Sequence, residues 1–167
     1  MGTLHRRRRD SRGASAVEFA LVAPILFLVM FGIIQYGLWF NDSLNTRQGV
    51  REAARMGVVA NYGTNPACSS KTGMEQLACE TVHQIDALTG VEYTKVSAAS
   101  WTQGEPLVVC AFVKTEGGVG LLPMPNGGWI FSRTELSIEE ALTEPDPLSG
   151  ASSPSLPADA PAWPAGC

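Results

Sequence analysis

The sequence predicts an α+β protein: a long N-terminal transmembrane helix continuing outside the membrane, a second short helix, a small antiparallel sheet of about three strands, and a disordered tail. Three observations support this fold. Residues 19–40 carry no charge, residues 72–89 place apolar side chains at helical spacing, and β-rich runs follow Gly90. We divide the 167 residues into a basic leader (1–13), a transmembrane helix (14–41), an extracytoplasmic α+β head (42–142) and a Pro-rich tail (143–167).

The first helix is predicted from the uncharged stretch 19–40. At 1.5 Å per residue, this stretch forms a helix of roughly 33 Å, which is enough to cross a hydrocarbon core of about 30 Å. A stripe of small apolar residues continues the helical pattern to about residue 59. Pro24 lies inside the helix, removes one backbone hydrogen bond and is expected to kink it, which membrane helices tolerate.

The charges on either side of this stretch predict its orientation. Residues 1–13 contain five arginines and one aspartate, a net charge of +4, whereas the rest of the chain carries −8. By the positive-inside rule, the N-terminus is cytoplasmic and the chain from about residue 41 is translocated. The acidic exterior argues against nucleic-acid binding, and a basic tract beside a span is typical of a topology signal or a contact with anionic lipid.

The second helix is predicted to begin at the capping box of residues 72–75, after the turn formers of residues 61–66, and to end before Gly90. Its buried face is expected to hold six apolar side chains: Met74, Leu77, Ala78, Val82, Ile85 and Leu88. Gln76, Glu80 and His83 fall on the opposite side of the helix. We therefore predict a solvated histidine there rather than a metal ligand.

Three strands are predicted at residues 91–98, 107–115 and 129–139. Glycines and prolines crowd the connection between the second and third strands, which we expect to be long, exposed and mobile. The tail contains six prolines among its twenty-five residues and has little to bury, so it is predicted to be disordered. Trp101 and Trp129 could form an adhesive surface, although core packing is the favoured interpretation.

The four cysteines indicate disulfide bonds in an oxidising compartment. Four cysteines allow three pairings, of which we favour Cys68 with Cys79 and Cys110 with Cys167. Their spacing contains no Cys-x-x-Cys motif, so we predict no metal. We also expect no cofactor and no small-molecule substrate.

Glu18 is the residue that points to a function. A carboxylate at the start of a membrane span costs several kcal/mol unless a partner offsets it, and the rest of the span offers no partner. Cleavage after Gly13 would create an α-amine on Ala14, four residues before Glu18. The amine of a neighbouring subunit could then pair with this carboxylate and fix the axial register between two helices.

The residues around Glu18 carry a resemblance to a known family. The run from Gly13 to Pro24, the segment 32–37 and the segment 51–55 resemble the TadE-like family of tight-adherence (Flp) pilus assembly proteins, or minor pseudopilins. The resemblance implies cleavage between Gly13 and Ala14 by an aspartic prepilin peptidase, with Glu18 as the assembly residue. It implies a non-enzymatic protein of the bacterial cytoplasmic membrane whose partners are membrane lipid, the prepilin peptidase and other pilin subunits.

Two other readings remain open. The first is an uncleaved single-pass anchor that displays an adhesive or ligand-binding head, which would retain residues 1–13. The second is a tethered extracytoplasmic enzyme, for which the sequence supplies no convergent nucleophile and base. An ordinary secretory signal is disfavoured because the apolar run is too long and no small-x-small site follows it before Asn41.

Overall fold

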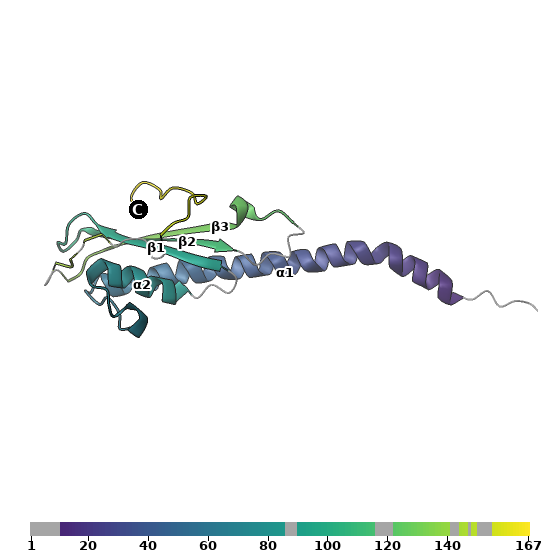
Figure 1. The fold of residues 1–167 in the computed structure, drawn as a ribbon, viewed down its shortest axis with the longest axis horizontal. Coiled ribbons are helices and arrows are strands. Elements are labelled where there is room, and N and C mark those ends of the chain that lie inside the picture. Colours follow the sequence, from purple (N-terminus) through teal and green to yellow (C-terminus); the bar gives the residue numbers. More distant parts are fainter. Residues whose placement is uncertain (1–10, 86–89, 116–121, 141–143, 147, 150–154) are drawn as a thin grey trace, which may run out of the picture.

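The fold consists of two helices packed against one three-stranded sheet (Figure 1). A computed structural model describes residues 11–85, 90–115, 122–140, 144–146, 148–149 and 155–167. The elements in chain order are α1 (Ser11–Gly57), η1 (Pro66–Cys68), α2 (Gly73–Ile85), β1 (Gly90–Ala98), β2 (Pro106–Thr115), η2 (Pro125–Gly128) and β3 (Trp129–Ser137). This order confirms the predicted α+β class. Residues 1–10 of the expected leader and the expected helical residues 86–89 lie outside the described part of the chain.

Helix α1 extends far beyond the rest of the molecule. Its 47 residues correspond to about 70 Å of helix, and Figure 1 shows the N-terminal part projecting as a bent rod. Pro24 lies inside the helix without ending it. At the other end, the carbonyl of Val58 accepts hydrogen bonds from the backbone N–H groups of Glu139 and Glu140, so the chain after β3 caps the end of α1.

The sheet has the order β1-β2-β3, and both pairs are antiparallel. The three predicted runs agree with the observed strands to within two residues at each end. Cys110 lies at the centre of β2, opposite Lys95 of β1 and Arg133 of β3. Because β2 pairs with a strand on each side, it is the central strand of the sheet.

One face of the sheet packs on α1 and α2. The small side chains of Val50, Ala53 and Ala54 in α1, and of Val58 just after its end, are buried, which lets the helix approach β2 closely. From the helix-facing side of the sheet, the core receives Val96, Leu107, Val109, Ala111, Val113 and Ile130. The stripe of small residues read from the sequence is therefore the surface on which the head assembles.

The other face of the sheet is covered by the C-terminal segment (Figure 1, yellow). A disulfide joins Cys110 to Cys167, and the rings of Phe112 and Trp163 lie 4.9 Å apart between centroids. The tail was predicted to be disordered, and its residues 155–167 contain no helix or strand. Their end is nevertheless held covalently on the sheet, and so β2 is buried on both of its faces.

The polar side of α2 differs from the prediction in one respect. Glu80 was expected on the solvated side, but it is buried because the loop before η1 folds over it. Its carboxylate accepts a hydrogen bond from the backbone N–H of Asn65, and Gln76 donates to the carbonyl of Gly63 at 2.9 Å. The Cys68–Cys79 disulfide fastens the same loop to α2. His83 is exposed, as expected.

Candidate assembly helix

The N-terminal part of α1 stands free of the head. Within residues 13–30, every residue except Ala23 is exposed, although most of them are apolar. The large apolar side chains exposed there are Val17, Phe19, Leu21, Val22, Ile25, Leu26, Phe27, Leu28, Val29 and Met30. A helix of this length and composition is able to cross a membrane. An apolar surface this large needs lipid or other helices around it.

Gly13, Ala14 and Glu18 lie on this free part of the helix. Ala14 and Glu18 are four residues apart, so they share one face, about one helical turn from each other. Glu18 is exposed and forms no hydrogen bond or ion pair with any residue that the structure describes. Apart from its own helix, no described residue has an atom within 4 Å of a Cβ added at Gly13, so the surroundings of this position are open. The arrangement leaves both the expected cleavage position and the carboxylate accessible to another protein.

The next part of α1 makes contacts that the sequence did not reveal. Gln35 is fully buried, and its amide donates a hydrogen bond of 2.7 Å to the carbonyl of Leu122. The hydroxyl of Tyr36 donates to the carbonyl of Pro123 at 3.0 Å, and a Cβ on Gly32 would lie 2.9 Å from the Leu122 side chain. The sequence did contain a signal for these contacts: the polar pair Gln35 and Tyr36 lies next to a glycine within an apolar run.

These contacts correct one expectation about the β2–β3 connection. The connection was predicted to be exposed, but its described part, beginning at Leu122, packs against α1 because Gln35 and Tyr36 bind its carbonyl groups. Residues 116–121 lie outside the described part of the chain. The head therefore grips α1 as far down as Gly32, well inside the uncharged stretch.

The cysteines pair as the sequence favoured. The sulfur atoms of Cys68 and Cys79 are 1.98 Å apart, and those of Cys110 and Cys167 are 1.99 Å apart. His83 brings a ring nitrogen within 4.8 Å of the first pair, a spacing that could suit a metal ion. Two sulfurs bonded to each other provide no thiolate ligands, and we assign this cluster to the disulfide.

The two tryptophans also follow the favoured interpretation. Trp101 and Trp129 are both buried, and Trp101 packs against Tyr62 with 6.5 Å between ring centroids. Trp129 contacts Phe112 edge to face and lies beneath the ammonium group of Lys114. These rings are part of the packing of the head rather than an adhesive surface.

The comparisons with known proteins single out the same helix. The family model described as TadE-like protein matches residues 13–55, from the expected cleavage position to the last turns of α1. Neither the curated proteins nor the solved structures contain a match to the chain. The matched segment includes Glu18, Pro24 and the Gly32–Tyr36 contact region. The N-terminal helix of this chain thus matches the TadE-like protein family, which confirms the resemblance seen in the sequence.

Proposed function

We propose that this protein is a minor pilin, or pseudopilin, needed to assemble a tight-adherence (Flp) pilus. The TadE-like family suggests a protein associated with such pili. In our proposal, α1 anchors the chain once in the bacterial cytoplasmic membrane, with the N-terminus in the cytoplasm and the head outside. A prepilin peptidase removes residues 1–13, and the mature chain associates laterally with other pilin subunits. The protein itself is structural and not an enzyme.

The observation that carries this proposal is the isolated carboxylate of Glu18. It lies on a bare apolar helix, has no partner among the described residues and falls inside the family-matched segment. A carboxylate in a membrane span is costly by several kcal/mol unless it is paired. Cleavage before Ala14 creates a positive charge at the start of each mature helix. Pairing of Glu18 with that amine on a neighbouring subunit would offset the cost and set the axial register.

The first experiment tests the cleavage. The protein is recovered from membranes of cells with an active prepilin peptidase, and its intact mass and N-terminal sequence are measured. We expect a chain that begins Ala14-Ser15-Ala16, and we expect Gly13→Leu to retain all of residues 1–13. Retention of the arginine-rich start in the native chain would contradict the proposal and favour the uncleaved anchor.

The second experiment tests the register. Glu18→Ala and Glu18→Gln should still be cleaved, because the change lies beyond the cleaved bond, but should be depleted at least tenfold from the sheared pilus fraction. A tenfold loss corresponds to about 1.4 kcal/mol, a modest share of a buried charge pair. The matched control is Glu140→Gln, which removes an exposed carboxylate from the head. Normal incorporation of both Glu18 variants would contradict the register role.

A further inference from the structure

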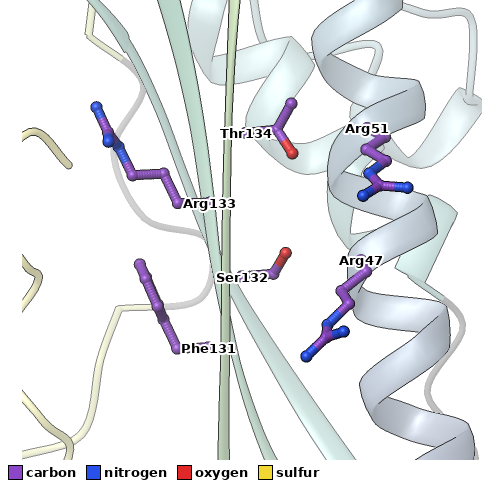
Figure 2. A pocket seen from close by; sticks show the side chains of 6 residues that line it. All are labelled: Arg47, Arg51, Phe131, Ser132, Arg133 and Thr134. Carbon is purple, nitrogen blue, oxygen red and sulfur yellow. The ribbon is translucent and has the colours of Figure 1, made fainter.

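A notch between α1 and the edge strand β3 holds two arginines that have no partner in the described part of the chain. Arg47 and Arg51 line a cavity of about 310 Å³ together with Phe131, Ser132, Arg133 and Thr134. Figure 2 shows Ser132 and Thr134 pointing from β3 toward the arginines, while Phe131 and Arg133 point to the other side of the strand. The notch therefore presents two guanidinium groups on one wall and two hydroxyl groups on the other.

Among the described residues, none neutralises the charges of this notch. Arg47 and Arg51 form no ion pair or hydrogen bond with the residues that the structure describes. Two nearby arginines are paired with carboxylates. Arg55 binds Glu52 with contacts of 2.6 and 3.0 Å, and Arg133 binds Glu135 at 2.6 Å. None of the described residues that line the cavity is acidic. In a chain that is otherwise acidic, the notch is a local site for an anion.

The distance along α1 between the notch and the uncharged stretch indicates the source of that anion. Arg47 follows the last residue of the uncharged stretch, Phe40, by seven positions, or about 10 Å, and Arg51 lies about 6 Å higher. Helical side chains lean toward the N-terminus, which brings the Arg47 guanidinium back toward the membrane. The headgroup region extends roughly 5–8 Å beyond the hydrocarbon core. Arg47 therefore reaches the headgroups, and Arg51 lies one helical turn farther from the hydrocarbon core.

The contacts of the β2–β3 connection also place the notch close to the membrane. Because Leu122 and Pro123 bind Gln35 and Tyr36, which precede Phe40, this end of the head lies at the level of the uncharged stretch, and the head is not raised above the membrane. The strand that follows this connection, β3, carries Ser132 and Thr134. The hydroxyl wall of the notch thus starts from the part of the head closest to the lipid.

We infer that the notch formed by Arg47, Arg51, Ser132 and Thr134 binds the phosphate headgroup of an anionic, amine-free phospholipid in the leaflet on the side of the head. Guanidinium groups donate paired hydrogen bonds to phosphate oxygens, and hydroxyl groups can donate to the remaining oxygens. A headgroup with an ammonium group would meet two arginines and no acid. This inference rests on the proposed membrane orientation but not on the cleavage of the leader.

The test uses the full chain in lipid nanodiscs made of phosphatidylcholine with increasing phosphatidylglycerol. Since the leader arginines can also hold anionic lipid, the readout must be local: hydrogen–deuterium exchange of the backbone within β3, residues 129–137. We expect exchange in wild type to slow as phosphatidylglycerol increases. Each arginine near an anionic leaflet contributes about fivefold to binding, so Arg47→Gln with Arg51→Gln should require at least tenfold more phosphatidylglycerol for half-maximal protection.

Two further variants separate the site from general charge effects. Arg55→Gln removes one positive charge from an already paired residue one turn farther along α1, and its protection curve should stay within twofold of wild type. Ser132→Ala with Thr134→Val keeps both arginines and removes the hydroxyl donors, and should weaken protection by two- to fivefold. Unchanged disulfide content and helical circular dichroism verify that each variant is folded.

The remaining outcomes would overturn the inference in distinguishable ways. Equal protection by inorganic phosphate in phosphatidylcholine discs would show a free-anion site. Stronger, arginine-dependent protection by polyglutamate than by phosphatidylglycerol would show an acidic protein partner. A chain that enters the discs but shows no lipid-dependent protection would refute the lipid site alone, whereas a chain that does not enter them would refute the membrane orientation as well.

Discussion

Gly49→Ala tests how tightly α1 and α2 cross. Alanine normally stabilises a helix interior by about 1 kcal/mol relative to glycine. Here the added Cβ would lie 2.8 Å from both the Cα and the backbone nitrogen of Ile85 in α2. Ordinary contact begins at 3.4 Å, so the helices must separate by about 0.6 Å. Overpacking of this kind costs about 1–3 kcal/mol and outweighs the gain in helix propensity.

We therefore expect Gly49→Ala to destabilise the head by about 1–2 kcal/mol and to lower Tm by about 5–15 °C. The assay is thermal unfolding of the full chain in detergent with the disulfides intact, followed by near-ultraviolet circular dichroism. Gly37→Ala is the matched control, because a Cβ there meets no atom within 4 Å in the described part of the chain beyond its own helix. Ile85→Val should not rescue Gly49→Ala, since the clashing backbone atoms remain. A Gly49→Ala protein as stable as Gly37→Ala would refute the close crossing.

Two further predictions concern the head. Replacing Cys68 and Cys79 with serine should cost about 3 kcal/mol, as expected for a crosslink between residues eleven positions apart, and a loss below 1 kcal/mol in thermal unfolding would contradict it. Burial raises the pKa of Tyr62, whose hydroxyl has no hydrogen-bond partner among the described residues. Folding therefore favours the neutral phenol, so stability should fall as the pH rises above about 10, where the unfolded chain ionises first. Tyr62→Phe should be at least as stable at pH 7 and should lack this alkaline loss, which unfolding at pH 8 and pH 11 would measure.

Features that depend on local pattern were predictable from the sequence. The strands were located to within two residues because β-rich runs were bounded by glycine and proline. The start of α2 at Gly73 followed from the capping pattern, and the long helix followed from hydropathy. Both disulfides were the favoured pairs, and for Cys68 and Cys79 the short separation in sequence was the guide.

Features that depend on contacts between distant segments were not predictable. Glu80 was expected in solvent because helical periodicity cannot show that a preceding loop covers the polar face. The burial of Gln35 depends on a carbonyl group 87 positions away. The sequence pattern did not single out Arg47, and Arg51 appeared only as part of the family segment 51–55. They form a notch only because the fold brings β3 beside them.

The two disulfides are sequential along the chain and do not interleave. If the head emerges from the membrane in N-to-C order, the thiols of Cys68 and Cys79 meet and oxidise first, after a delay of only eleven residues. Cys110 then enters a compartment in which no earlier thiol is left to capture it, and it waits for Cys167. Under the proposed export, this order disfavours both mispaired arrangements, and we expect maturation to depend on a thiol oxidase more than on a disulfide isomerase.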